Sequence, residues 1–338
     1  MNQPHAAPPI AIDDSWRGWI AENLVLGGHP QSLLGVMVDK GVAEDSARAE
    51  LEAAMRSPYL RGALRLANRV AKRDWVLGIQ SRLNKLAPRA VPRRERLSGA
   101  AFLDEYYSRN QPVIITGMLD DCAARSKWTF DYLAAQLGER EVEVQFGRDA
   151  DPDYEINSVQ HKRRMPFGDY VALVRNAGVT NDFYMTANNS GQNRAALREL
   201  MNDLPPLTEY LQADSDSFFW FGPAGTITPF HHDLTNNFMI QVAGRKRVLL
   251  IAPCDTPKLY NYRHCYTQVD GRSIDVQRFP QMAEVQVIEC VLAPGEILFL
   301  PVGWWHFVEA LDVTITISTT RFKWDNDFYT WYPANRDF

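Results

Sequence analysis

The chain has 338 residues, of which 46% are hydrophobic and 23% are charged. This composition is typical of a folded globular protein and excludes a largely disordered one. The 36 basic and 41 acidic side chains leave a net charge of −5, so no overall positive field attracts nucleic acid or anionic lipid, and we expect neither as a partner.

The cysteines and the first residues bear on the cellular compartment. The four cysteines form no C-x-x-C spacing and are too few for a disulfide scaffold. The opening stretch "MNQPHAAPPIAIDDSW" has neither the basic nor the apolar region of a signal peptide, and no apolar run reaches the ~18 residues of a membrane span. We therefore expect free thiols and a cytoplasmic location.

Residues 1–90 are predicted to form an α-helical segment. Apolar residues recur at helical spacing in four stretches between residues 15 and 88, and the stretches are separated by Gly27, Gly28, Gly41 and Pro58. The apolar stripe of residues 33–38 must be buried somewhere. We expect these helices to dock a partner or substrate. Packing on the following domain, or pairing of two chains in a homodimer, would bury the same stripes.

The stretch "PRAVPRRERLSG", residues 88–99, is predicted to be an exposed, non-helical connection. Its two prolines disfavour a helix, and its four arginines indicate a solvated segment rather than a nucleic-acid site. We place the boundary between the two domains here, with the second domain covering residues 91–338.

Residues 91–338 change to short β-rich runs with turn residues between them. Examples are "PVIITG", "VEVQF", "DFYMTA", "SFFWFG", "NFMIQVAG", "KRVLLIAP", "VQVIECVLAPGEILFLP" and "VTITIST". Helical pieces such as "AAFLDEYYSR" and "FDYLAAQLG" lie among the early runs, and "HKRRM", residues 161–165, is expected to be a solvated loop. Many short strands with regular turns predict a mainly β domain, a barrel or sandwich whose interior can hold a ligand.

The stretch "TPFHHDLTNNF", residues 228–238, contains the first candidate metal ligands. Side chains alternate between the two faces of a strand, so His231 and Asp233 share a face while His232 points the other way. A further histidine, His306, follows the turn in "PGEILFLPVGWWHFVEA", 75 positions after His231. Two imidazoles and one carboxylate leave coordination positions open, as in non-haem Fe(II) oxygenases, whereas structural zinc uses a closed set of four ligands.

Three stretches in this order resemble the JmjC, or cupin-like, 2-oxoglutarate-dependent oxygenases. They are "RERLSGAAFLDEYYSRNQPVIITG", "GPAGTITPFHHDLTNNFMIQVAGRKRVLLIAP" and "PGEILFLPVGWWHFVEA", within residues 91–323. The branch that the chain resembles most is that of the hypoxia-inducible-factor asparaginyl hydroxylase. The resemblance implies a double-stranded β-helix, the JmjC/cupin jelly roll, with iron held by His231, Asp233 and His306.

The resemblance also implies a site for 2-oxoglutarate. Lys246 matches the lysine that binds the C5 carboxylate, and alternation places it on the face opposite to Arg245 and Arg247. Thr228 and Tyr184 match further contacts to this carboxylate, although Thr228 has the wrong strand parity relative to His231 unless Pro229 interrupts the strand.

Two more residues are assigned less directly. Asn237 matches a position near the C1 carboxylate or the metal. Ser318 stands where the asparaginyl hydroxylases have a second asparagine, so that contact differs in this chain. Trp304 and Trp305 are predicted to pack at the rim of the barrel.

A regular hairpin would separate these residues too widely. If residues 231–242 and the strand from residue 245 formed one hairpin, Lys246 would lie roughly 33 Å from His231 along the strand. The resemblance therefore requires residues 231–236 to leave the strand, and "DLTNN" is turn-prone.

The resemblance implies an enzyme that consumes Fe(II)-bound dioxygen and 2-oxoglutarate, releases succinate and carbon dioxide, and hydroxylates a C–H bond. We expect a side chain of a protein or peptide as substrate. Alternatives within this fold are a small-molecule hydroxylase and an N-methyl-lysine demethylase. A cupin isomerase would normally carry a His-x-His pair, and a binding module without activity would be expected to have lost a ligand or the lysine.

Overall fold

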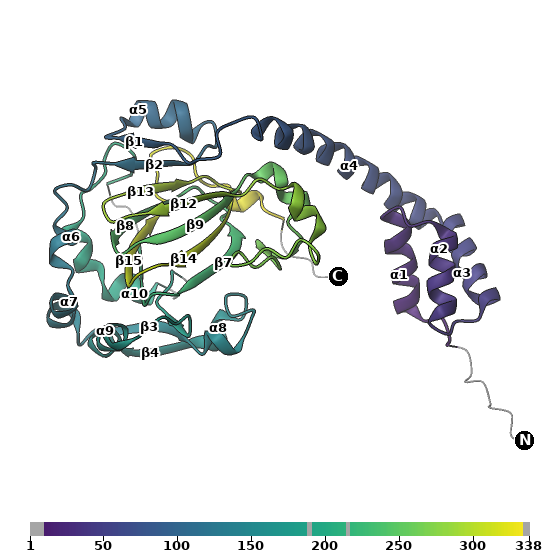
Figure 1. Ribbon diagram of the computed structural model, residues 1–338, viewed down its shortest axis with the longest axis horizontal. Helices are drawn as coiled ribbons and strands as arrows, with labels where there is room; N and C mark the ends of the chain where they lie inside the picture. Colours follow the sequence, from purple (N-terminus) through teal and green to yellow (C-terminus); the bar gives the residue numbers. More distant parts are fainter. Residues whose placement is uncertain (1–9, 188–190, 214–216, 334–338) are drawn as a thin grey trace, which may run out of the picture. The chain divides into compact units, whose positions relative to one another are not determined.

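The computed structural model describes residues 10–187, 191–213 and 217–333. The chain divides into two compact units, Met1–Gln80 and Ser81–Phe338 (Figure 1). The division lies near the predicted domain boundary at residue 90, which stays a prediction. In the described part of the chain, no helix combines the length and apolar character that a membrane crossing requires.

The first unit is helical, as predicted. Its helices are α1 (Asp14–Val25), α2 (Pro30–Asp39), α3 (Glu44–Arg56) and the first part of α4 (Pro58–Asn84). The carboxylate of Asp13 accepts a hydrogen bond from the backbone N–H of Trp16 and so caps α1. In α2, Leu33, Leu34 and Met37 are buried, but Val36 and Val38 are exposed. The predicted stripe was therefore too wide, because consecutive residues of a helix point in different directions.

The second unit contains two six-stranded sheets and one small sheet. The strand orders are β1-β2-β13-β8-β15-β6, β10-β11-β7-β14-β9-β12 and β4-β3-β5. The strands of the first large sheet are β1 (Arg93–Glu95), β2 (Val113–Thr116), β13 (Ile297–Leu300), β8 (Asn237–Ala243), β15 (Thr314–Thr319) and β6 (Ser217–Gly222). Those of the second are β10 (Asn261–Arg263), β11 (Tyr266–Thr267), β7 (Ile227–His232), β14 (Trp305–Ala310), β9 (Lys246–Ile251) and β12 (Ile288–Leu292). The third sheet contains β4 (Lys162–Pro166), β3 (Glu141–Phe146) and β5 (Phe183–Tyr184).

From β6 to β9, and again from β12 to β15, the chain passes from one large sheet to the other between successive strands. Strands β6, β8, β13 and β15 belong to the first sheet, whereas β7, β9, β12 and β14 belong to the second. This alternation is that of a double-stranded β-helix, so the predicted mainly β fold with an N-terminal helical segment is confirmed. Neighbouring strands are antiparallel except for β1 and β2.

Short helices surround the sheets of the second unit (Figure 1). They are α5 (Gly99–Phe102), α6 (Ala123–Lys127), α7 (Phe130–Leu137), α8 (Ser158–His161), α9 (Phe167–Asn176) and α10 (Gln192–Ala196), and α5 continues into a π-helical turn, Leu103–Tyr107. The apolar faces of α7 and α9 belong to a core that also includes Phe219, Phe221 and Phe238 from the first large sheet. A second core includes Phe230, Trp305 and Phe307 from the second large sheet.

One sequence prediction in this unit was incomplete and another was wrong. The arginine-rich connection is non-helical and mostly exposed, as predicted, but it also contains β1, with Val91 and Leu97 buried on either side of it. The arginines that follow Val91 pair with acidic residues from distant segments: Arg93 with Glu296, Arg94 with Glu105 and Arg96 with Asp120. The predicted loop at residues 161–165 is largely β4, which pairs with β3. In both cases the strand exists because an open sheet edge pairs with it, and a single sequence stretch does not reveal that edge.

Candidate metal and co-substrate site

The structure brings His231, Asp233 and His306 together. One ligand atom from each lies within 4.8 Å of the others. The Nε2 atom of His231 is 3.7 Å from Oδ1 of Asp233, and Nε2 of His306 is 4.0 Å from Oδ2. His306 lies directly opposite His231 because β14 pairs with β7 at these two residues. The described residues contain no other group of three His, Cys, Asp or Glu side chains with this spacing.

Backbone carbonyls orient both imidazoles. Nδ1 of His231 donates to the carbonyl of Pro229 at 2.8 Å, and Nδ1 of His306 donates to the carbonyl of Trp304 at 3.0 Å. Because each Nδ1 carries the proton, each Nε2 presents its lone pair toward Asp233. Burial and the neighbouring His306 lower the pKa of His231 to about 4, so this imidazole is neutral near pH 7, the form that binds a metal.

Asp233 lies just beyond the end of β7. Its Oδ2 accepts a hydrogen bond from Nδ2 of Asn237 at 3.1 Å, and its backbone carbonyl accepts one from the N–H of Gly303 at 3.1 Å. Asn237 begins β8, which is in the other large sheet. The chain therefore leaves the strand after His232, as the distance between His231 and Lys246 required.

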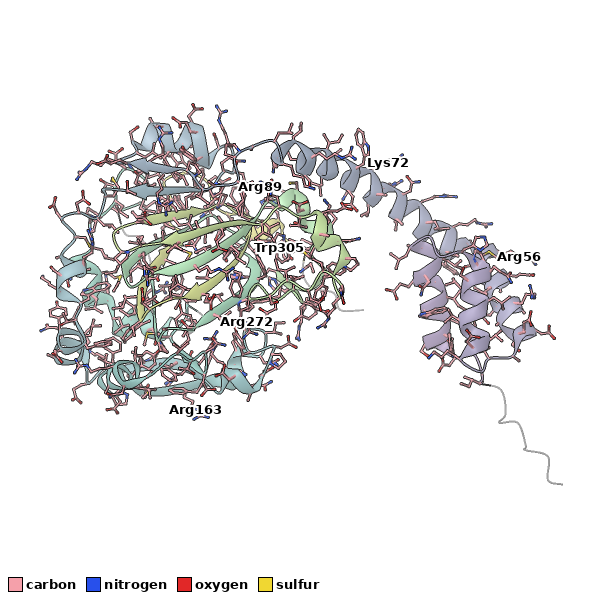
Figure 2. All side chains as sticks on the ribbon, in the orientation of Figure 1. Arg56, Lys72, Arg89, Arg163, Arg272 and Trp305 are labelled. Carbon is pink, nitrogen blue, oxygen red and sulfur yellow. The ribbon has the colours of Figure 1, made fainter. Side chains whose placement is uncertain are left out.

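His232 lies outside this group. Its ring packs edge-on against Trp305, with 4.8 Å between ring centroids, and also contacts Tyr332. The paired tryptophans are packing residues: Trp304 and Trp305 are both buried, and Trp305 is labelled in Figure 2. The strand alternation that separated His231 from His232 is thus confirmed for their side-chain directions.

A cavity of about 310 Å³ opens beside the three candidate ligands. The sequence-predicted residues that line it are His231, Asp233, His306, Lys246, Thr228, Asn237 and Ser318. Tyr184 is the one predicted site residue that is not part of this lining; it lies behind Lys246, whose Nζ donates to the Tyr184 hydroxyl at 3.0 Å.

Lys246 is buried, with 2% of its surface exposed. Its burial lowers the pKa of the ammonium to about 7, since a charged group is costly in an apolar environment. The flanking residues point outward, where Arg245 pairs with Asp312 and Arg247 pairs with Glu289. The side-chain alternation predicted for this strand is therefore confirmed.

A β-bulge resolves the parity of Thr228. In the pairing of β7 with β14, His231 is opposite His306 and Thr228 is opposite Val308. Three residue steps on β7 thus match two steps on β14, and the extra residue falls at Pro229–Phe230. Thr228 and His231 consequently share the face that lines the cavity.

Ser318 and Asn237 add polar atoms to the cavity wall. The Ser318 hydroxyl accepts a hydrogen bond from Nε1 of Trp220 at 2.7 Å, and the Lys246 ammonium lies 5.9 Å from the centre of the same indole ring. The buried Oδ1 of Asn237 has no hydrogen-bond partner among the described residues. A buried amide oxygen without a donor is destabilising, so this atom is a candidate contact for a bound ligand.

Sequence reasoning missed other residues of the cavity wall, among them Tyr266 and Glu155. The ring of Tyr266 stacks on His231, with centroids 5.7 Å apart, because β11 pairs with β7 at these positions. The Glu155 carboxylate also lines the cavity and pairs with the fully buried Arg148 at 3.0 Å. Glu155 comes from the segment between β3 and β4, far from any site motif. Tyr266 follows "RHC" in a short strand, which offered only a weak β signal.

The donor set fits a non-haem Fe(II) centre. Two imidazole nitrogens and one carboxylate oxygen converge beside a cavity, and the hydrogen bonds on the far side of each imidazole fix its orientation. A closed structural zinc site would need a fourth protein ligand.

Comparison with known proteins agrees with this geometry. Residues 99–327 match the model of the cupin-like domain. The chain belongs to the cupin-like domain family. The matched segment of this cupin-like protein contains both large sheets apart from β1, together with every residue of the candidate site.

Several curated proteins are similar to this cupin-like chain. Lysine-specific demethylase 8 of Xenopus tropicalis is 30% identical over 68% of this chain and 52% of its own length. Lysine-specific demethylase JMJ30 of Arabidopsis thaliana is 31% identical over 72% and 56%. The tRNA wybutosine-synthesizing protein 5 of Gallus gallus is 30% identical over 68% and 76%.

The chain spans about half the length of the two demethylases. The predicted membership of the JmjC/cupin-like family is confirmed by these comparisons. The narrower likeness to the asparaginyl hydroxylases stays a prediction, since the relatives named here carry other names.

Proposed function

We propose that this protein is an Fe(II)- and 2-oxoglutarate-dependent oxygenase that hydroxylates a side chain in a protein or peptide. The observation that carries the proposal is the convergence of His231, Asp233 and His306 on a cavity that also contains a buried lysine. When bound, Fe(II) with 2-oxoglutarate and dioxygen supplies the oxidising power for C–H hydroxylation, with succinate and carbon dioxide as co-products.

The metal would be held by Nε2 of His231, a carboxylate oxygen of Asp233 and Nε2 of His306. The protein contributes the geometry: carbonyls fix the imidazoles, and Asn237 holds the carboxylate by a hydrogen bond of 3.1 Å. Such hydrogen bonds to metal ligands typically change metal affinity by roughly 10–100-fold.

The 2-oxoglutarate would bind with one carboxylate at the Lys246 ammonium. Tyr184 supports Lys246 by accepting its hydrogen bond, and Thr228 and Ser318 offer hydroxyls in the same cavity wall. Asn237 takes part through its Nδ2 bond to Asp233; its free Oδ1 only accepts hydrogen bonds and therefore has no partner on 2-oxoglutarate, which carries no donor. An anion that pairs with Lys246 would offset the cost of burying its charge.

The test of this proposal is metal-dependent turnover of 2-oxoglutarate. The purified protein with Fe(II) should form succinate slowly even without a substrate. The variant His231→Ala should lose both bound iron and succinate formation, whereas His232→Ala is the matched control and should keep both. Equal losses in the two variants would contradict the assignment of His231.

N-methyl-lysine demethylation is the second candidate function, because two of the relatives are named lysine-specific demethylases. Incubation of peptide libraries, and separately of tRNA, with the protein, Fe(II) and 2-oxoglutarate, followed by mass spectrometry, separates the two. Gain of one oxygen on carbon supports hydroxylation. Loss of a methyl group from a methylated lysine would replace hydroxylation by demethylation, and a product on tRNA alone would exclude both.

We propose that the helical segment docks a partner or substrate. A deletion that tests this must keep the end of α4, because two of its residues contact the rest of the second unit. The Ser81 hydroxyl donates to the buried Asp255 carboxylate at 2.7 Å, and Asn84 bonds to Cys254. A chain lacking residues 1–76 keeps these contacts, and a chain lacking residues 1–88 removes them. If the chain lacking residues 1–76 still turns over 2-oxoglutarate but no longer modifies its polypeptide substrate, docking is supported. If this truncated chain no longer binds iron, the helices are part of the fold.

A further inference from the structure

Helix α4 carries an uncompensated basic stripe. Between Pro58 and Asn84 the sequence has six basic side chains and one acidic one. Five of the basic residues lie between residues 61 and 73, at spacings of three, four and eight that place them on one face of the helix. They are Arg61, Arg65, Arg69, Lys72 and Arg73.

The basic residues of the preceding helices are paired, unlike those of the stripe. Arg17 pairs with Asp14 and Glu50, and Arg48 and Arg56 pair with acids one turn earlier. None of the five stripe residues forms an ion pair or hydrogen bond with the described part of the chain, and all five are exposed. Lys72 is labelled in Figure 2. The stripe therefore keeps its full charge for an external anion.

Large apolar side chains border the stripe. Tyr59, Leu66 and Val70 form one line along the helix, with 88%, 61% and 51% of their surfaces exposed. This line runs beside Arg69 and Arg73. Trp75 and Val76 follow the stripe, 69% and 57% exposed. Exposed apolar side chains of this number on one helix indicate an interaction surface.

The basic stripe and the exposed apolar side chains together indicate which kind of anionic partner α4 binds. Nucleic acid would pair with the arginines but leave Leu66, Val70 and Val76 in water, and a second copy of α4 would bring two basic stripes together. An anionic lipid surface takes both features, since headgroup phosphates pair with the basic residues and the headgroup region accepts the apolar side chains.

We propose that α4 binds an anionic lipid surface through residues 59–76. Arginine forms bidentate hydrogen bonds with phosphate, which suits a stripe with four arginines and one lysine. The net charge of −5 for the whole chain led to the expectation of no membrane partner, but it averages over a strongly basic helix and acidic remaining segments. The proposal is independent of the oxygenase chemistry.

The test is co-sedimentation of the full chain with vesicles. The probes are vesicles of phosphatidylcholine alone and vesicles of two parts phosphatidylcholine to one part phosphatidylserine. The protein should bind the second kind, and added salt should weaken binding because it screens the charges. Replacing Arg61, Arg65 and Arg69 by Gln should weaken partitioning on the order of 100-fold, at about 1 kcal/mol for each basic residue.

Two further variants show whether vesicle binding depends on the stripe itself or on the total charge of the chain, and whether the apolar side chains contribute. The control replaces three exposed cations outside α4 by Gln, namely Arg163, Arg278 and Lys323; it should bind as the natural chain does. The pair Leu66→Gln and Val70→Gln should weaken binding several-fold while all charges remain. Circular dichroism checks that each variant keeps its helix content.

Three results would overturn the proposal. One is binding that does not distinguish the two kinds of vesicle, and another is an equal loss in the stripe and control variants. The third is preferential binding of an RNA or DNA oligonucleotide, which would assign the stripe to nucleic acid. Succinate formation should be unchanged in every variant, so failure here is distinct from failure of the oxygenase proposal.

Discussion

Replacement of Lys246 by methionine tests the co-substrate site most directly. The ammonium is buried and donates to Tyr184 at 3.0 Å. No carboxylate pairs with it in the described chain, and burial alone accounts for its lowered pKa of about 7. A charge-assisted hydrogen bond to a carboxylate contributes roughly 1.5–3 kcal/mol. The variant Lys246→Met should therefore bind 2-oxoglutarate about 10- to 150-fold more weakly.

The pH dependence adds a second readout. The carboxylates of 2-oxoglutarate are ionised above about pH 5, so Lys246 is the group whose protonation controls the charge pair near neutrality. Above its pKa of about 7, each pH unit should lower the affinity of the natural protein about tenfold. The methionine variant should show no such decrease, because it has no ammonium to deprotonate.

The free protein should show the same titration in its stability. Lys246 has a pKa of about 7 when folded and an ordinary value of 10.5. Between these values the unfolded chain binds more protons, so the free energy of unfolding should rise with pH, by about 1.4 kcal/mol per unit. Below pH 7 both states are protonated and the contribution is constant. The methionine variant should lack this rise.

Calorimetric titration with Mn(II) in place of Fe(II), at three pH values between about 6.5 and 8.5, measures these affinities. The matched control is Arg247→Met, whose side chain points outward to Glu289 and Glu309. The control should keep both the affinity and its decrease above pH 7. Equal weakening in both variants, or an affinity of the natural protein that is constant with pH, would refute the assignment of Lys246.

Three other substitutions test a contact to a metal ligand and two contacts that stabilise the fold. Asn237→Leu removes the hydrogen bond to the metal-binding carboxylate and should lower Mn(II) affinity roughly 10–100-fold; an unchanged affinity in a metal titration would contradict this. Trp305→Ala should lower the free energy of unfolding, measured with urea, by about 3–5 kcal/mol because Trp305 is fully buried. The control Trp331→Ala, at a residue that is 85% exposed, should change it by no more than about 0.5 kcal/mol. Ser81→Ala removes one hydrogen-bond donor from the buried Asp255 carboxylate and should lower the free energy of unfolding by about 1–3 kcal/mol. A stability equal to that of the natural protein would show that this contact is unimportant.

The sequence revealed the features that depend on local periodicity. Alternation along residues 245–247 separated Lys246 from its arginine neighbours, and alternation in β7 separated His231 from His232. Both separations appear in the structure. Strand period is a property of consecutive residues, so it can be counted without knowledge of any partner strand.

Features that depend on pairing between distant segments were missed. The bulge that brings Thr228 onto the face of His231 exists only in the register of β7 against β14. β4 forms because β3 offers an edge. Glu155 reaches the cavity because Arg148, itself buried, holds its carboxylate. Each depends on contacts between residues that no local pattern connects.

The crossing between the two sheets explains why the site forms where it does. The N–H of Gly303 donates to the carbonyl of Asp233 at 3.1 Å, and the N–H of Val302 donates to Oδ1 of Asn236 at 2.8 Å. The turn that precedes His306 therefore also holds the segment that contains Asp233. Asn236 is buried, and its backbone bonds to Asn326 in both directions. One small network thus positions the carboxylate and the second histidine together, so the turn-prone letters "DLTNN" and "PVGWWH" act as a single structural unit although they are far apart in the chain.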